Sequence, residues 1–210
     1  MFVKSIMIPK HRCITAQHNE TLRSALQKLE NHQIHGMPII DGDRYEGIVT
    51  KYHIYESYLL SSKQKDEFLD STYVQDIATH QEVFLVGVAA FEKTLLELRD
   101  APVLAVCDNN RRILGIMTRS DVLEQFQSAF GVNRPGIRIA LTSVETEGRL
   151  ARLSEIAHQF QEHIISLVTF DETDKLVRRI VMKIEKKNNI DRFTKKLEEH
   201  GFRILSVRED

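Results

Sequence analysis

The feature that most constrains this chain is an internal repeat. Residues 47–50 read Gly-Ile-Val-Thr, and residues 115–118 read Gly-Ile-Met-Thr. Each copy follows an apolar stretch that ends in an aspartate, Asp41 or Asp108, and each precedes an amphipathic stretch with helical spacing. Such self-similarity predicts one supersecondary unit that is built twice. Each unit is predicted as a lead-in segment, a strand, a helix, a strand, a tight turn, a strand and a helix.

The turn inside each unit has a chemical basis. Asp-Gly-Asp and Asp-Asn-Asn separate the apolar runs at 41–43 and 108–110, and these residue types tolerate the backbone angles of a hairpin. A polar stretch follows the first unit and predicts a linker. The sequence therefore predicts repeat 1 over residues 1–60, a linker over 61–72 and repeat 2 over 73–130.

After Gly131 the pattern changes, and Arg-Pro-Gly at 134–136 indicates a boundary. The remaining segment predicts strand, helix, strand, strand, helix and strand in that order, with Gly201 closing the second helix. This order is that of a ferredoxin-like domain. We therefore predict an α+β fold, with two tandem repeats in one module followed by a βαββαβ domain over 135–210.

Composition argues against several classes of protein. Lys plus Arg total 29 and Asp plus Glu total 30, a net charge of -1, whereas non-specific nucleic-acid binding and electrostatic membrane anchoring need a basic excess. The longest apolar run, residues 83–91, is shorter than the roughly 20 residues of a membrane span. No secretory signal is apparent, and Cys13 and Cys107 do not make a disulfide framework. We expect a soluble cytoplasmic protein without nucleic-acid or membrane partners.

The second copy of the motif places polar groups on a turn between a strand and a helix, which we expect to begin near Asp121. The Asp121 carboxylate can accept hydrogen bonds from both ribose hydroxyls, and the Thr118 hydroxyl can add another. Arg119 supplies a guanidinium beside a helix N-terminus that favours anions. This chemistry fits a nucleotide. The alternatives are a helix cap formed by Asp121 and Glu124, and a solvated surface charge at Arg119.

These motif residues resemble a known family. The glycine, hydrophobic residue, threonine and following acid resemble the signature of CBS domains, matched fully by residues 115–121 and, except for His53 in place of Asp, by residues 47–53. Two such units in tandem resemble a Bateman module. The C-terminal segment resembles an ACT domain, most closely at Gly148-x-Leu150. The whole chain is similar to the AcuB-like acetoin-utilisation accessory proteins.

The resemblance implies an adenine site in repeat 2. Its first strand and the apolar run before its aspartate would enclose the base, at Val83, Phe84, Val103 and Leu104. Ala105 departs from the family pattern, because repeat 1 has Pro38 at the corresponding position.

Repeat 1 carries a possible degenerate second site, formed by Met37, Pro38, Thr50, Lys51 and His53. A neutral histidine ring has one acceptor nitrogen and cannot replace a carboxylate that accepts from two hydroxyls. The site is either lost and sealed by aromatic residues such as Tyr52 and Tyr55, or it takes another group with Lys51 and His53 facing a phosphate. We expect the former.

The family often holds an amino acid at the first strand-to-helix turn of the ACT domain. Here that turn reads Glu-Thr-Glu-Gly at 145–148 instead of the usual Asp-x-Pro-Gly. A dimerisation or partner surface is therefore the favoured interpretation of this domain.

We expect a non-enzymatic regulatory sensor without catalytic residues, metal or resident cofactor. Its ligand would be an adenosine compound, among them AMP, ADP, ATP, S-adenosylmethionine, NAD and cyclic di-AMP, and binding would change a contact with a protein partner. We also expect a homodimer, because both repeats offer apolar helix surface: Tyr55, Tyr58, Leu59, Phe126 and Phe130. The alternative is a small metal protein or enzyme that uses His53, Cys13 and nearby acids.

Overall fold

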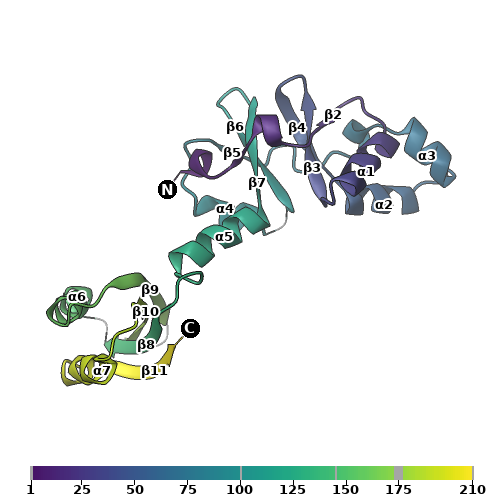
Figure 1. The fold of residues 1–210 in the computed structure, drawn as a ribbon. Helices are drawn as coiled ribbons and strands as arrows, with labels where there is room; N and C mark the ends of the chain where they lie inside the picture. Colours follow the sequence, from purple (N-terminus) through teal and green to yellow (C-terminus); the bar gives the residue numbers. More distant parts are fainter. Residues whose placement is uncertain (1, 100, 145, 173–176, 210) are drawn as a thin grey trace. The chain divides into compact units, whose positions relative to one another are not determined.

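The computed structural model describes residues 2–99, 101–144, 146–172 and 177–209 (Figure 1). The chain divides into two compact units, Met1–Leu123 and Glu124–Asp210. None of the described helices is long and apolar enough to cross a membrane.

The first unit contains two small sheets, one for each repeat. The first has the strand order β2-β3-β4 and the second has the order β1-β7-β6-β5. The strands are β1 (Ile8–Pro9), β2 (Ala16–Gln17), β3 (Gly36–Asp41), β4 (Arg44–Thr50), β5 (Phe84–Val86), β6 (Val103–Cys107) and β7 (Ile113–Thr118). The helices are α1 (Leu22–Asn31), α2 (Lys51–Leu59), α3 (Lys65–Ser71), α4 (Lys93–Glu97) and α5 (Arg119–Ala129), with short 3-10 turns η1 (Val3–Ser5), η2 (Lys10–Arg12) and η3 (Val74–Ile77).

The two sheets share one buried cluster of side chains. Tyr45 and Ile48 from the first sheet pack with Val103, Ala105 and Ile116 from the second. Tyr45 is fully buried, and its hydroxyl donates to the backbone oxygen of His80 at 2.8 Å. A second cluster lies between the first sheet and its helices, and it includes residues of α1, α2 and α3.

The lead-in segment of each repeat crosses to the sheet of the other repeat. Strand β1 pairs antiparallel with β7, so that Ile8 lies opposite Ile116. In return, Thr79 pairs with Ile48 of β4, and their backbone N–H groups donate to each other's oxygens at 3.1 and 2.8 Å. The predicted boundaries follow the order of the chain, whereas the sheets exchange these segments.

The two glycines that open the repeated motif lie beneath the crossing segments. A Cβ on Gly115 would lie 2.2 Å from the backbone oxygen of Ile8, and a Cβ on Gly47 would lie 2.7 Å from the backbone oxygen of Thr79. Gly47 also has a φ of +135°. Both positions require glycine because another backbone approaches closely. The repeated glycine therefore has a structural cause in the exchange.

The predicted linker over residues 61–72 is mostly helix. It contains α3, and Phe68 and Leu69 on that helix are buried in the first repeat's core. The polar residues that suggested a linker form the outer surface of this helix.

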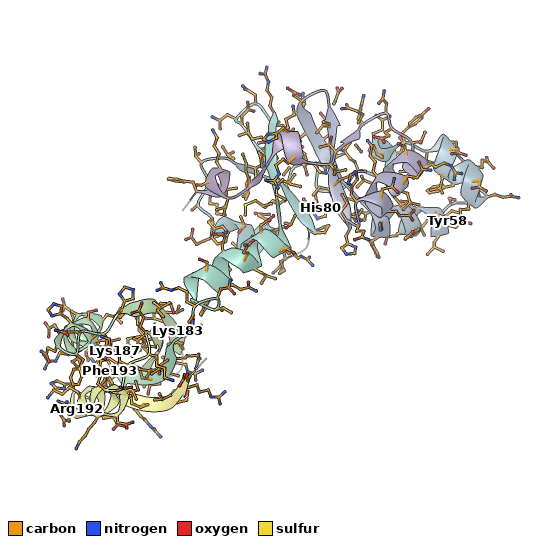
Figure 2. All side chains as sticks on the ribbon, in the orientation of Figure 1. Tyr58, His80, Lys183, Lys187, Arg192 and Phe193 are labelled. Atoms are coloured by element: carbon orange, nitrogen blue, oxygen red, sulfur yellow. The ribbon has the colours of Figure 1, made fainter. Side chains whose placement is uncertain are left out.

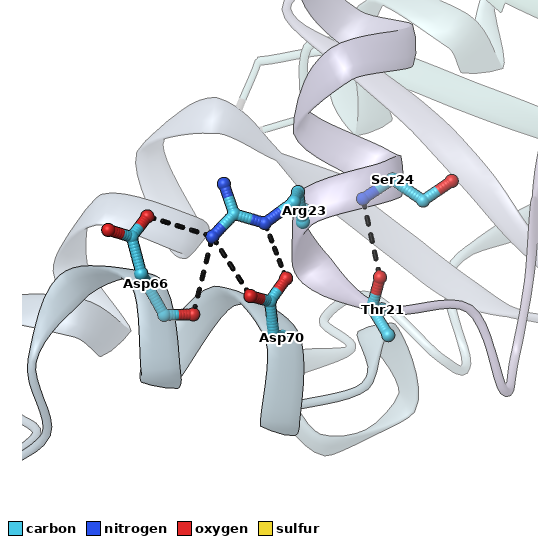
Figure 3. A network of polar contacts seen from close by, with 5 residues as sticks. All are labelled: Thr21, Arg23, Ser24, Asp66 and Asp70. Carbon is cyan, nitrogen blue, oxygen red and sulfur yellow. Dashed lines mark hydrogen bonds and ion pairs between the residues drawn. The ribbon is translucent and has the colours of Figure 1, made fainter.

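Arg23 fastens α1 to α3 (Figure 3). Its Nη2 donates to Asp66 Oδ1 at 2.8 Å and to Asp70 Oδ2 at 3.1 Å. Thr21 caps α1 by accepting from the backbone N–H of Ser24 at 3.4 Å. These contacts hold the supposed linker against the first repeat.

The second unit confirms the predicted ferredoxin-like order. Its sheet has the antiparallel strand order β11-β8-β10-β9, with α6 and α7 on one face (Figure 1). The elements are β8 (Ile137–Val144), α6 (Arg149–Gln159), β9 (Ile164–Glu172), β10 (Val177–Ile184), α7 (Ile190–Glu199) and β11 (Arg203–Glu209). The mixed α+β fold predicted from the sequence is therefore confirmed.

This unit begins before residue 135, within the segment assigned to repeat 2. The Phe130 ring stacks on Phe170 of β9 with 6.4 Å between ring centroids, and the Ser166 hydroxyl donates to the Phe130 backbone oxygen at 3.0 Å. Phe130, expected as part of a dimer surface, thus packs within its own chain.

We expect Gly115→Ala to lower the free energy of unfolding by about 1–3 kcal/mol, because the added methyl group meets the β1 backbone. The measurement is urea unfolding. Gly42→Ala is the matched control, since Gly42 has open space around it but a φ of +59°. A loss at Gly115 no greater than that at Gly42 would contradict the requirement for close approach.

Candidate ligand site

A pocket of about 400 Å³ lies where the crossing lead-in segment meets the motif of repeat 2. Ile8, Arg12 and Ile14 line it from the lead-in segment, and residues 33–36 line it from the end of α1 and the start of β3. Val103 and the motif residues 118–120 complete the wall. The volume is within the usual range for small-molecule sites.

The lining combines apolar walls with positive charge. Ile8, Ile34 and Val103 supply apolar surface, whereas Arg12 and Arg119 supply guanidinium groups. Arg12 makes no hydrogen bond or ion pair with any residue that the structure describes. Among the described lining residues there is no carboxylate. Such a pocket suits a ligand with an apolar body and an anionic group.

Thr118 and Asp121 form a reciprocal cap at the start of α5. One carboxylate oxygen of Asp121, Oδ2, accepts from the Thr118 N–H and from the Thr118 hydroxyl, each at 2.7 Å. The Asp121 N–H donates back to the hydroxyl oxygen at 3.2 Å. Helix α5 therefore begins at Arg119, two residues before the predicted start, and Asp121 caps it together with Thr118 and not with Glu124.

This cap leaves part of the Asp121 carboxylate available. Its Oδ1 has no hydrogen bond to any described residue. Asp121 lies beside the pocket without lining it, whereas Thr118 and Arg119 do line it. Of the three predicted motif residues, Thr118 and Arg119 thus line the pocket wall, and Asp121 is close to them in the chain.

Arg119 is held at the edge of the pocket by backbone carbonyls. Its Nε donates to the Leu98 oxygen at 2.9 Å, and its Nη2 donates to the Arg99 oxygen at 3.0 Å. These carbonyls follow the last turn of α4. The alternative of a purely solvated charge is therefore wrong, because the guanidinium has fixed partners.

Of the four residues predicted to enclose an adenine, only Val103 lines the pocket. Leu104, the next residue of the strand, points to the opposite face of the sheet and is fully buried. The Phe84 ring lies 6.0 Å from the Tyr45 ring, in the cluster between the sheets. Val83 is placed there too, since its backbone oxygen accepts from the Tyr45 hydroxyl at 3.2 Å.

The exchange of lead-in segments explains this difference. Ile8 and Ile34 of repeat 1 occupy the wall that the sequence had assigned to the first strand of repeat 2. Arg12 and His35 also line the pocket and were missed. Neither belongs to the repeated motif, so only knowledge of the exchange would have indicated them.

At the corresponding place in repeat 1, the other crossing segment contacts the motif. Thr50 caps α2 by accepting from the His53 N–H at 3.0 Å. The His53 Nδ1 lies 3.2 Å from the Thr79 hydroxyl, and the His80 Nδ1 lies 3.0 Å from the same oxygen. That hydroxyl also donates to the Ile48 backbone oxygen at 3.2 Å.

Tyr52 and Tyr55, the aromatic residues expected to seal this site, are 67% and 46% exposed. The Tyr52 ring lies edge-on to the His53 ring, with 5.6 Å between ring centroids. Met37 is fully buried in the core of the first repeat, and Pro38 is buried next to it. Lys51 is half-buried in the first turn of α2.

The groups named for a metal protein or enzyme are not assembled. Burial raises the pKa of the Cys13 thiol to about 11 and that of Cys107 to about 12, so both thiols are protonated near neutral pH. Among the residues that the structure describes, no group of three His, Cys, Asp or Glu side chains could hold a metal ion.

The second unit has its own hollow, of about 340 Å³, at the start of α6. Arg149 lines it, but its guanidinium donates to the Ser143 hydroxyl at 2.6 Å and to the backbone oxygens of His200 and Gly201 at 3.0 and 2.8 Å. It also lies over the Phe202 ring. The guanidinium therefore ties the start of α6 to β8 and to the turn between α7 and β11. Glu145 of the predicted turn lies outside the described residues.

Comparison with known proteins identifies the class of the first repeat. Residues 3–59 match the family model described as CBS domain. An uncharacterized protein of Methanocaldococcus jannaschii is 25% identical over 120 residues, which are 57% of this chain and 38% of the relative. The chain thus spans well under half the length of that relative.

Solved structures of similar fold include a CBS domain-containing protein. This protein, of unknown function, is from Bacillus anthracis (23% identity, 60% of this chain and 93% of that chain, TM-score 0.55). Another is CbpB of Listeria monocytogenes in complex with c-di-AMP (22%, 62% and 98%, TM-score 0.54). A third is CBSX2 in complex with AMP (21%, 63% and 98%, TM-score 0.50).

These findings confirm the resemblance at the level of fold. Residues 3–59 match the CBS domain model, and the fold is similar to that of a CBS domain-containing protein.

The environment of His53 predicts a pH-dependent stability. Burial and the nearby His80 lower the His53 pKa, while Glu56 acts in the opposite direction. In the unfolded chain His53 has an ordinary pKa near 6.5, whereas in the folded chain its pKa is lower. As the pH falls through 6.5, His53 is therefore protonated more in the unfolded chain than in the folded chain, and the free energy of unfolding decreases.

We expect His53→Gln to reduce the loss of unfolding free energy between about pH 7 and pH 5. Urea unfolding at several pH values measures it, and His32→Gln, an exposed histidine at the end of α1, is the control. An unchanged pH profile for His53→Gln would contradict the assignment.

Proposed function

We propose that this chain is a non-enzymatic regulatory protein that binds an adenine nucleotide or adenosyl ligand in the pocket of the first unit. The observation that carries the proposal is the lining of that pocket, where apolar walls face Arg12, His35 and Arg119 without a described carboxylate. Two proteins of similar fold support it, because their structures hold c-di-AMP and AMP.

Each part of the lining has a task in this proposal. The base lies against Ile8, Ile34 and Val103, where apolar surface leaves water on binding. A phosphate meets Arg12, whose planar guanidinium can bind it through two parallel hydrogen bonds. The ribose lies near Thr118, within reach of the unused carboxylate oxygen of Asp121.

Arg119 links the pocket to a neighbouring helix. An anion in the pocket competes with the Leu98 and Arg99 carbonyls for its guanidinium, so that bound and empty states favour different arrangements of α4. A ligand that favours one arrangement shifts the population towards it. We propose that this shift changes a contact with a protein partner.

The proposal includes a homodimer in the cytoplasm. Tyr52, Tyr55, Leu59 and Leu60 of the α2 region are exposed and supply apolar surface for a second copy. Both cysteines are unpaired, as is usual in a reducing compartment. The similarity to AcuB-like proteins makes acetoin utilisation the first pathway in which to seek the partner.

A thermal-shift panel tests ligand class. At 100 times its dissociation constant, a ligand of the folded state stabilises by about 2.7 kcal/mol, which for this length raises the unfolding midpoint by about 5–10 °C. We expect that shift from AMP, ADP or ATP, or from another adenosine compound, and little from GTP.

In Arg12→Gln, a nucleotide should raise the unfolding midpoint no more than adenosine does. Arg112→Gln, at an exposed arginine away from the pocket, is the control. No shift from any adenosine compound at millimolar concentration would overturn the proposal.

Two substitutions at Asp121 separate capping from ligand binding. Asp121→Ala should cost about 1 kcal/mol of stability and weaken nucleotide binding by about 1.5–3 kcal/mol. Asp121→Glu keeps a carboxylate at the position that a capping box prefers, so stability should return. Binding should not, because the longer side chain displaces the oxygen offered to the ribose.

Unfolding free energy without ligand and calorimetric affinity are measured on the same three proteins. His53→Ala is the control for repeat 1 and should change affinity much less. Affinity that returns together with stability in Asp121→Glu would show that Asp121 only caps the helix.

A further inference from the structure

The sheet of the second unit has one face that α6 and α7 do not cover. Ile139 and Leu141 of β8 point towards the helices, so Arg138, Ala140 and Thr142 point to the other face by strand alternation. The register extends this face across neighbouring strands, because directly opposite residues share a face.

Two rows of this face carry positive charge. In one row, Thr142 lies between Arg203 of β11 and Arg179 of β10. In the other, Arg138 lies between Arg208 of β11 and Lys183 of β10. Between the rows lie Ala140 and Val181, which are buried, and Lys183 in the second row is buried as well. The exposed groups of the two rows are therefore the arginines at their ends. We call Arg138, Thr142, Arg179, Arg203 and Arg208 the arginine face.

The guanidinium groups of three of these arginines, Arg138, Arg203 and Arg208, make no hydrogen bond or ion pair with any residue that the structure describes. Arg138 and Arg208 are directly opposite each other, an arrangement that destabilises a sheet through like-charge repulsion. An anion on this face would relieve that repulsion.

The row at Thr142 is also hollowed. A pocket of about 440 Å³ is lined by Thr142, Arg179 and Arg203 together with the apolar side chains of Val144 and Leu205. Val144 is 58% exposed and Leu205 is 46% exposed. The occupant therefore needs acidic groups next to apolar ones.

The spacing of the two rows indicates the shape of the occupant. Arg138 and Thr142 are four residues apart on β8, a separation of roughly 13 Å at the rise of an extended strand. Two carboxylates four residues apart on an extended peptide have the same separation. An extended acidic segment laid along β8 would reach both rows.

Other polyanions and a second copy fit less well. Single-stranded nucleic acid needs aromatic side chains for its bases, and Phe170, the one aromatic residue in the described part of this face, is already stacked on Phe130. Two copies of the arginine face would repel each other. An acidic protein segment agrees best with the observed chemistry.

We propose that the arginine face docks an extended acidic segment of a protein partner, with carboxylates about four residues apart and apolar residues between them. The surface lies within the second unit and does not depend on the nucleotide pocket. It would be the place where the regulatory protein of the proposed function meets its target.

The probe is a fluorescent peptide of about ten residues with two glutamates four residues apart among valines and threonines. Fluorescence anisotropy with the full chain, without nucleotide, measures its affinity at about 20 and about 200 mM salt. A peptide with glutamines in place of the glutamates is the matched control. An oligothymidylate of similar length tests the alternative that the face binds single-stranded nucleic acid.

We expect the glutamate peptide to bind more tightly than the glutamine peptide. We expect its affinity to be lower at the higher salt concentration. Arg138→Gln with Arg203→Gln should reduce its affinity about tenfold or more. Arg192→Gln makes a control of the same kind at an exposed position on α7, on the helix side of the sheet (Figure 2), and should leave affinity unchanged.

The proposal would be overturned if both peptides bound with equal affinity, or if the oligothymidylate bound more tightly than the glutamate peptide. It would also be overturned if Arg192→Gln lost as much affinity for the glutamate peptide as the double variant does. Circular dichroism checks that the variants fold. The nucleotide thermal shift should be the same in the double variant as in the original chain, so failure of the docking surface is distinguishable from failure of the nucleotide site.

Discussion

The close passage of a crossing backbone over a motif glycine is the constraint on which the rest of the first unit depends. Strand β1 can pair with β7 only because Gly115 leaves room for the Ile8 carbonyl, and Thr79 can pair with Ile48 only because Gly47 leaves room in the same way. Each sheet is therefore completed by residues from the other half. Neither repeat buries its inner face alone, since the cluster between the sheets draws on both.

The same exchange makes the two motifs unequal. At repeat 2 the crossing segment brings Ile8 and Arg12 to the wall of an open pocket. At repeat 1 the crossing segment brings Thr79 and His80 against His53. Both motif threonines cap a helix, but only Thr118 is paired with a carboxylate. The duplicated unit thus has a pocket beside its second motif and a histidine contact with the crossing segment at its first.

The sequence predicted what depends on local pattern. Periodicity and turn chemistry gave the repeats, the strands around each motif and the ferredoxin-like order of the second unit. The exchange could not be predicted, because Val3-x-x-Ile6 and Val74-x-x-Ile77 each precede their own repeat and nothing local in either segment specifies the sheet it joins. Helix α3 was missed because its charged outer surface conceals Phe68 and Leu69, which the core needs.

The site was predictable only as far as it is local. Thr118 and Arg119 follow from the motif, and Val103 follows from the apolar run before Asp108. Leu104 was assigned to the same wall because adjacency in sequence was taken as adjacency in space, whereas consecutive residues of a strand face opposite sides. Arg12 and His35 depend on the exchange, so no spacing within either repeat indicates them.

The inequality of the two motifs has a consequence for how such a module could respond. A symmetric pair of sites would bind two ligands, and their effects on the two sheets could oppose each other. Here the anion-compatible lining and the guanidinium that holds the α4 carbonyls lie at the same motif. At the other motif the Thr79 hydroxyl contacts both His53 and His80, and burial together with the neighbouring His80 lowers the pKa of His53. In the proposed function, one ligand per chain would then act through Arg119, while protonation of His53 would act separately at the other motif.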